Sequence, residues 1–217
     1  MPTLLIIGAG PGIGQATARR FGREGWRVVL AARNEAKLRE LASDLADRGV
    51  DASVATVDAG DPAAVAELIE EVAASDGGLD TVHYNAAVLR SAPFFDITDE
   101  EIAEALAVNI GGALAAIRAA RRVFGGRGGT VLLTGGGLAL HPSADAVTLG
   151  LGKAGIRHMA EALHASLANI GIHLATVTVN VAVDPGSAKA DGVADRFWSL
   201  QTQEPAAWTW EGSYSGA

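Results

Sequence analysis

Short, mostly apolar runs alternate along the chain with longer stretches whose apolar residues recur at helical spacing. The short runs span residues 4–7, 28–31, 52–57, 79–84, 129–134 and 172–179. The first lacks polar alternation, as is typical of a strand covered on both faces. Strands alternating with helices predict βαβ units. We therefore expect an α/β fold with a doubly wound, Rossmann-type parallel sheet, strand order 3-2-1-4-5-6 with a seventh strand as an option, and helices on both faces.

Capping residues mark where several of the helices begin. Asn34 precedes a helix expected to end near residue 48, and Asp61 precedes a proline suited to the first helical position. Thr98 and Glu101 form a capping box that opens a helix expected to reach about residue 124. Another helix is expected from 15 to 24, and a long one from about 146 to 168.

The C-terminal part, from about 187 to 217, predicts one short helix followed by an aromatic tail. The helix is expected over about 189–200, and the tail carries Trp208, Trp210 and Tyr214. We expect these aromatic side chains to pack on the protein's own core or on a partner chain. Such a short C-terminal part leaves room for only a short lid over a substrate.

The composition narrows the class of protein. With 217 residues, 49% of them hydrophobic and 19% charged, we expect one domain over 1–217. The net charge of -8 argues against nucleic acid or an anionic membrane as partner. No run approaches the roughly eighteen apolar residues of a membrane helix, and no basic leader is visible, so a cytoplasmic protein is expected. The sequence has no cysteine, which excludes thiolate chemistry, and no metal site is expected.

Three glycines between the first strand and the first helix predict a phosphate site. Gly8 makes the turn, Gly12 lets a pyrophosphate approach the backbone, and Gly14 lets the helix pack close to the strand. The first N–H groups of a helix have no intrahelical partner, and the helix dipole is positive there. We interpret the stretch as a dinucleotide site, with a plain glycine-rich turn as the alternative.

Arg33 follows the second predicted strand, about 20 positions past the glycines. In dinucleotide folds a carboxylate at this place binds the ribose 2′-hydroxyl, whereas an arginine accepts a 2′-phosphate. Because Ala32 offers no carboxylate, NADP(H) is favoured over NAD(H). A solvated arginine at the start of a loop is the alternative.

The string Gly8-Ala-Gly-Pro-Gly-Ile-Gly14 resembles the cofactor loop of the short-chain dehydrogenase/reductase family, and the resemblance extends over residues 1 to about 180. It implies a cofactor-binding set made of Gly8, Gly10, Gly12, Ile13, Gly14, Arg33, Asp58, Asn85, Ala86, Ala87 and Lys153. In this set Asp58 contacts the adenine amino group, for which a turn aspartate is the alternative. Tyr84 departs from the family pattern and is expected to pack on the cofactor or the core.

The same resemblance implies two catalytic residues. Asn109 lies inside a predicted helix, where asparagine is a poor helix former, and the family has a structural or proton-relay asparagine beside a local bend there. A solvent-facing asparagine is the alternative. Lys153 matches the lysine that lowers the pKa of a catalytic tyrosine and holds the nicotinamide ribose. Resembling proteins pair the helices equivalent to 98–124 and 146–168, which implies a homodimer or homotetramer.

The family's catalytic tyrosine and serine are missing. Counting back four residues from Lys153 gives Leu149, and thirteen more gives Gly136. Neither residue can donate a hydrogen bond from its side chain. A carbonyl reductase of this kind therefore needs a substitute proton donor. The candidates are Thr134 and His141, together with Ser143, Thr148 and Tyr84.

Three functions remain compatible with this pattern. The first is an atypical NADP(H)-dependent oxidoreductase that acts on a carbonyl, alcohol or imine of a small molecule with a substitute proton donor. The second is an NADP(H)-binding protein without redox turnover, such as a sensor or a partner subunit. The third is a cyclase or isomerase that uses the same pocket for its shape and charge.

Overall fold

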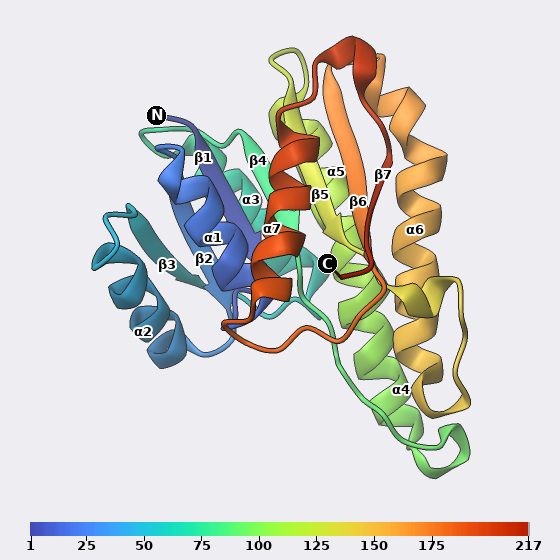
Figure 1. The fold of residues 1–217 in the computed structure, drawn as a ribbon. Helices are drawn as coiled ribbons and strands as arrows, with labels where there is room; N and C mark the ends of the chain where they lie inside the picture. The colour runs from blue at the N-terminus through green and yellow to red at the C-terminus, as the bar shows by residue number, and fades with distance from the viewer. Residues whose placement is uncertain (217) are drawn as a thin grey trace.

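A computed structural model describes residues 1–216 as a sheet of seven parallel strands between two layers of helices (Figure 1). The order of the strands across the sheet is β3-β2-β1-β4-β5-β6-β7. The strands are β1 (Thr3–Ile7), β2 (Arg27–Ala32), β3 (Ala52–Thr56), β4 (Thr81–Tyr84), β5 (Gly129–Thr134), β6 (Ile172–Val179) and β7 (Glu211–Tyr214). The predicted fold class and the order of the first six strands are confirmed.

The helices divide between the two faces of the sheet. One face is covered by α1 (Ile13–Arg23), α2 (Glu35–Ala46) and α7 (Ala188–Gln201). The other is covered by α3 (Pro62–Ala74), α5 (Ala113–Phe124) and α6 (Val147–Ala168), with α4 (Asp99–Leu106) leading into α5. Each layer buries its own apolar cluster against the sheet, so the central strands are buried on both faces.

The expected helix 98–124 is one continuous rod with a change of winding in its middle. The capping box at Thr98 is present, with its side chain accepting from the Glu101 N–H. Between α4 and α5, the segment Ala107–Gly112 is a π-helix and contains Asn109. Residues that widen a helix in this way shift the side chains that follow, and such segments are frequent at functional sites.

The same rod corrects one expectation drawn from the sequence. Asp99–Phe124 contains an 18-residue window with mean hydropathy 1.4, which is long and apolar enough to cross a membrane by these two criteria alone. In the fold its apolar side packs against the sheet and α3: Ala113, Ala116, Ile117 and Phe124 are buried. The apolar content of this helix is explained by its position in the core.

The aromatic tail forms the seventh strand instead of lying free. β7 pairs with β6 in parallel, from Thr176 opposite Glu211 to Val179 opposite Tyr214. Trp208 stacks on His173 with ring centroids 4.9 Å apart, and Trp210 packs against the core cluster of α3, α5 and α6. Of the two expectations for these aromatics, packing on the protein's own core is the one the structure supports. Short helical turns at Phe94–Asp96, Gly137–Ala139, Ala144–Ala146 and Pro205–Ala207 complete the described chain.

Candidate functional site

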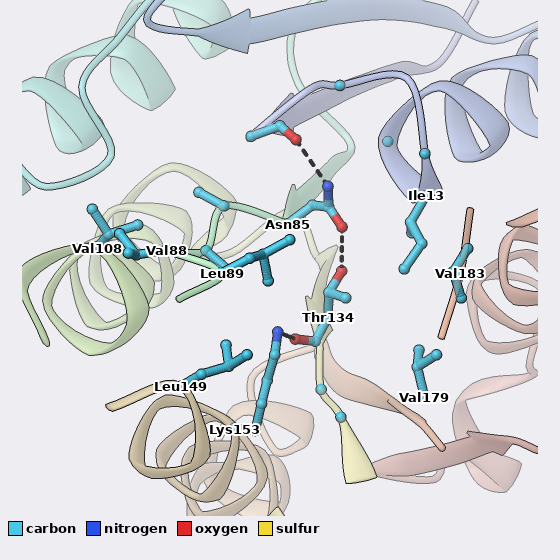
Figure 2. A pocket seen from close by; sticks show the side chains of 18 of the residues that line it. Ile13, Asn85, Val88, Leu89, Val108, Thr134, Leu149, Lys153, Val179 and Val183 are labelled. Carbon is cyan, nitrogen blue, oxygen red and sulfur yellow. Dashed lines mark hydrogen bonds between the residues drawn. The ribbon is translucent and has the colours of Figure 1, made fainter. Parts of the chain in front are cut away.

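A large cleft runs along the carboxyl ends of the strands, where parallel α/β sheets bind their ligands. Its volume is about 1340 Å³, more than the roughly 300–1,000 Å³ of a typical single-ligand pocket. The glycine loop, the ends of β2 and β3, and the segments after β4, β5 and β6 all contribute to its walls. The start of α6 closes it from the side, as Figure 2 shows around Leu149 and Lys153. The cleft can therefore take a dinucleotide and a second ligand together.

The glycine loop packs closely against the protein backbone at Gly8 and Gly14 and leaves room for a ligand at Gly10 and Gly12. Gly8 has φ +89°, and a Cβ on it would lie 2.3 Å from the Ala86 backbone nitrogen, so only glycine fits. A Cβ on Gly14 would lie 3.2 Å from Ala9 Cα, so the absence of a side chain here lets the start of α1 lie close to the end of β1. Gly10 and Gly12 face open space in the cleft. Gly12 caps α1 without a side-chain hydrogen bond, and the first turn of α1 carries no acidic residue, so this helix start suits an anion.

Arg33 and Asp58 line the cleft at the ends of β2 and β3, on the side of the glycine loop. The Arg33 guanidinium is exposed and forms a surface ion pair with Glu104 at 3.7 Å. Asp58 uses one carboxylate oxygen to accept the Gly60 N–H at 2.9 Å, as a turn aspartate does, and still faces the cleft. Both residues are therefore within reach of a ligand held at the glycine loop.

Asn85 joins the glycine loop to the end of β5. Its side-chain Nδ2 donates to the Gly8 carbonyl at 2.8 Å, and its Oδ1 accepts the Thr134 hydroxyl at 2.8 Å (Figure 2). The neighbouring Ala86 and Ala87 line the cleft as expected for small residues beside a ligand. This position of Asn85 steadies the centre of the sheet and leaves the cleft walls free.

His83 completes that network and is a residue that the sequence analysis missed. It is fully buried on β4, and its Nε2 lies 2.9 Å from Thr134 Oγ1. Since the Thr134 hydroxyl proton goes to Asn85, the imidazole must donate, which places the His83 proton on Nε2. Burial, with a smaller effect of Lys153, lowers the pKa of His83 to about 3, so the ring is neutral. In the sequence, a histidine within the short predicted strand that ends at Tyr84 was the feature that could have indicated a buried polar contact.

Thr134 is therefore a poor substitute acid. Its hydroxyl gives its proton to Asn85 and accepts one from His83, and it is only 7% exposed. A hydroxyl committed in both directions has no proton left for a substrate. The interpretation of Thr134 as proton donor loses support for this reason, although the residue does line the cleft.

Lys153 reaches into the cleft from the first turns of α6. Its Nζ donates to the Thr134 carbonyl at 2.8 Å, which uses one of the three donors of an ammonium group (Figure 2). The other two are available to ligands in the cleft. Burial lowers the pKa of Lys153 to about 8, close enough to neutrality for proton exchange. Lys153 thus brings an ionisable group into the cleft away from Arg33 and Asp58, which lie at the ends of β2 and β3.

The two departures from the family pattern lie directly beside this lysine. A Cβ on Gly136 would lie 3.2 Å from Lys153 Cγ, so the lysine stem occupies the space over this glycine. Leu149, about one helical turn before Lys153, points into the cleft next to it (Figure 2). Position 136 is where the family pattern has a serine, and position 149 is where it has a tyrosine. In this chain neither side chain can donate a hydrogen bond to a ligand.

Asn109 and Tyr84 support the cleft from behind its wall. Asn109 Oδ1 accepts the Val88 N–H at 2.8 Å and so holds the loop after β4, while its Nδ2 is buried without a partner among the described residues. Tyr84 is 1% exposed, its hydroxyl donates to the Val108 carbonyl at 2.5 Å, and burial raises its pKa. Tyr84 is therefore a core residue, and of the two alternatives for Asn109 the solvent-facing one is wrong.

The remaining candidate proton donors differ in whether they line the cleft. His141 is exposed on the segment after β5 and lines the cleft, so it stays a candidate. Ser143 accepts the Asp145 N–H through its hydroxyl and caps the short turn Ala144–Ala146. Thr148 is 3% exposed and, like Ser143, lies outside the residues that line the described part of the cleft.

Comparisons with known proteins agree with this geometry. The sequence model of the family described as short chain dehydrogenase matches residues 2–197. Probable oxidoreductase EphD of Mycobacterium tuberculosis (strain ATCC 25618 / H37Rv) is 33% identical over 178 residues, which make up 81% of this chain and 30% of that protein. The chain thus spans about a third of that relative's length.

Two further relatives match over most of their length. Versicolorin reductase 1 of Aspergillus parasiticus is 32% identical over 223 residues, covering 94% of this chain and 80% of that protein. A metagenomic short-chain oxidoreductase, solved in complex with NADP, superposes with a TM-score of 0.88 at 26% identity, covering 98% of this chain and 96% of that one. The cleft described above therefore occurs on a scaffold that binds NADP in a related protein.

Proposed function

Because this chain belongs to the short-chain dehydrogenase family, we propose that it is an NADP(H)-dependent oxidoreductase that interconverts a carbonyl, or an imine, and its reduced form in a small molecule. The observation that carries the proposal is the position of Lys153, whose ammonium group enters the same cleft that the glycine loop opens onto. When bound, NADPH would supply a hydride to the carbonyl carbon, and the chain would have to supply the one proton that the carbonyl oxygen needs to become a hydroxyl.

The residues present fit this cofactor. The uncapped start of α1 at Gly12, with open space over Gly10 and Gly12, would hold the pyrophosphate, and the neighbouring Ile13 and Gly14 line the same cradle. Asp58 and Arg33 would hold the adenosine end. Because the ion pair of Arg33 with Glu104 is solvent-exposed and therefore weak, the guanidinium would also be able to bind a 2′-phosphate, which favours NADP(H) over NAD(H).

We assign the proton donor to Lys153 itself. The Thr134 hydroxyl is committed to Asn85, and the wall next to Lys153 is formed by Leu149 and Gly136, so no side-chain hydroxyl stands between the ammonium group and the cleft. A buried lysine with a lowered pKa gives up a proton more readily than a solvated one. Lys153 Nζ would pass a proton to the substrate oxygen and regain it from water in the cleft, with His141 at the rim as the alternative donor.

The protein's surface is consistent with association of copies. Leu114 on α5 and Leu151 on α6 are 41% and 52% exposed. These helices are the ones expected to pair, so we propose a homodimer or homotetramer. The cytoplasmic location stays a prediction from the sequence.

A second candidate is a protein that binds NADP(H) without turning it over. Leu149 and Gly136 favour it, since both remove groups that polarise a carbonyl in the family. Loss of a positioned acid lowers a rate by about 10²–10⁴-fold, which slows hydride transfer without forbidding it.

Two measurements separate these functions. Calorimetric titration with NADPH and NADH should give micromolar or tighter binding of NADPH and weaker binding of NADH. NADPH absorbance should then fall when a neutral ketone is added, and Lys153→Met should abolish that fall while retaining binding within about tenfold. Binding without turnover on any ketone or imine would favour the second candidate, product formation without net NADPH oxidation would favour a cyclase or isomerase, and no dinucleotide binding would reject all three.

A further inference from the structure

Aliphatic side chains line the cleft that Lys153 enters. They come from four separate segments: the loop after β4, the segment after β5, the first turn of α6 and the segment after β6. The residues are Val88, Leu89, Leu138, Leu140, Leu149 and Val181. Figure 2 shows Leu89 and Leu149 on the same side of the cavity as the end of the Lys153 side chain. A ligand reaching Lys153 therefore meets hydrocarbon from several directions.

Two of these side chains are exposed to an unusual degree for their size. Leu89 is 78% exposed and Leu140 is 48% exposed, although both belong to the wall of one cleft. Single exposed leucines are ordinary on protein surfaces, but apolar residues gathered at the mouth of a cavity mark a site that a ligand covers. Because Leu89, Leu140 and Leu149 line the same cleft as Lys153, a substrate held at Lys153 is the occupant that would cover them.

Charged recognition groups are scarce at this end. Among the described residues that line the cleft, the ionisable ones are Arg33, Asp58, His141 and Lys153. The first two lie at the ends of β2 and β3, on the side of the glycine loop. Arg90, on the loop after β4, is held in ion pairs by Glu101 and Glu104. A carboxylate or phosphate at the far end of the substrate, beyond the reach of Lys153, would lie against Leu89 and Leu140 with no free guanidinium to receive it, which is unfavourable.

We infer that the substrate is an uncharged carbonyl compound with a hydrophobic body that extends from Lys153 past Leu149 to Leu89 and Leu140. This inference rests on the proposed oxidoreductase function and specifies its substrate class. Burial of each additional methylene contributes about 0.8 kcal/mol, so kcat/KM should rise about fourfold per methylene while the chain lies against the aliphatic wall.

The test uses methyl ketones of increasing length, from butanone to decan-2-one, with the intact protein and NADPH. Hexan-2-one is paired with levulinate, which is of similar length and ends in a carboxylate. We measure kcat/KM by NADPH absorbance and, separately, affinity for the NADP⁺-loaded protein by calorimetry. We expect affinity to rise along the series, and levulinate to bind at least about tenfold more weakly than hexan-2-one.

Variants at the mouth locate the effect. Leu89→Ser and Leu140→Ser should lower kcat/KM about threefold to tenfold for decan-2-one and by a smaller factor for butanone, so that the increase of kcat/KM with chain length becomes less steep. Ile170→Ser, which removes an exposed aliphatic side chain between α6 and β6, serves as the control and should change neither. Equal affinity along the series, or preference for levulinate, would overturn the inferred substrate class even if turnover is observed. Affinity that rises with length in the absence of turnover would support the class and reject the proposed oxidoreductase.

Discussion

The aliphatic stem of Lys153 lies against Gly136, so that a Cβ on this glycine would be 3.2 Å from Lys153 Cγ and 3.4 Å from both Cδ and Cε. The missing serine and the position of the lysine are therefore parts of one arrangement. A side chain at position 136 would require the stem of the lysine that we place at the reacting end of the cleft to shift by a few tenths of an ångström.

Gly136→Ser should reduce activity, although it restores the residue usual in the family. The added side chain requires the Lys153 stem to shift by a few tenths of an ångström, which would lengthen the hydrogen bond from its Nζ to the Thr134 carbonyl, so we expect kcat to fall by up to about tenfold. The control is Gly150→Ser, where a Cβ would meet nothing nearer than 3.7 Å. A gain in kcat for Gly136→Ser would contradict the assigned role of the lysine position.

Leu149→Tyr should have the opposite effect. Position 149 faces the cleft about one helical turn before Lys153, so a phenol there could donate a proton to a substrate oxygen beside the ammonium group. We expect kcat for a small ketone such as butanone to rise by about tenfold to a hundredfold in steady-state assays. Leu149→Phe supplies the same bulk without the hydroxyl, and an equal gain in that variant would show that shape and not acidity is responsible.

The pH dependence of turnover should report the ionisation of Lys153. Its pKa is lowered to about 8 by burial, and reduction of a carbonyl requires the protonated ammonium form. The kcat for reduction should therefore be constant below pH 7 and fall about tenfold per pH unit above 8, whereas alcohol oxidation should rise over the same interval. Lys153→Arg keeps a positive charge that does not titrate, so its residual rate should be independent of pH. A wild-type profile that stays flat up to pH 10 would exclude Lys153 as the donor.

Arg33→Ala should weaken the binding of NADPH selectively. An ionic hydrogen bond to a phosphate contributes about 1.5–3 kcal/mol, so the dissociation constant for NADPH should rise roughly tenfold to a hundredfold, while that for NADH stays within about twofold. Calorimetry on both cofactors measures this, with Arg39→Ala, an exposed arginine on α2, as the matched control. A similar loss for both cofactors would mean that Arg33 does not read the 2′-phosphate.

His83 should make the fold sensitive to acid. The pKa of His83 is about 3 in the folded protein and 6.5 for a free histidine, so the unfolded chain binds more protons between these values. The free energy of unfolding therefore decreases as the pH falls from 6.5 towards 3.

His83→Leu removes this pH dependence and also the hydrogen bond to Thr134. At pH 7 the variant should therefore be less stable than the wild type by about 1 kcal/mol, and this difference should shrink as the pH falls, because only the wild type loses stability through His83. Urea unfolding at several pH values measures both effects. His158→Leu, an exposed histidine on α6, is the control, and parallel curves for wild type and His83→Leu would contradict the prediction.

Periodicity was sufficient to predict most of the sheet because the central strands are buried on both faces and therefore read as apolar runs. The strand predicted at 172–179 agrees with β6 at both ends, and the helix predicted at 146–168 begins one residue late. β7 was harder to predict, since Glu211–Tyr214 is a short edge strand with polar residues and a glycine. Its pairing depends on β6 and on the stacking of Trp208 over His173, contacts that no local pattern encodes.

The site divides in the same way. The glycine loop and Lys153 could be located from the sequence because backbone conformation and residue spacing constrain them locally. The commitment of the Thr134 hydroxyl could not be predicted, because it depends on His83 in the neighbouring strand β4 and on Asn85, the residue that follows this strand. The apolar character around Leu149 likewise emerges only when four segments come together in space.

The π-helical segment Ala107–Gly112 cannot change its length, because a contact at Asn109 and the buried face of α5 both depend on it. Each residue of an α-helix rotates the direction of its side chain by about 100°. Deleting one residue to restore regular winding would turn the buried stripe of α5, with Phe124, away from the sheet, or else turn Asn109 away from the Val88 N–H. The one residue that the π-helical turn adds therefore determines both the geometry of the loop after β4 and the face with which α5 packs on the sheet.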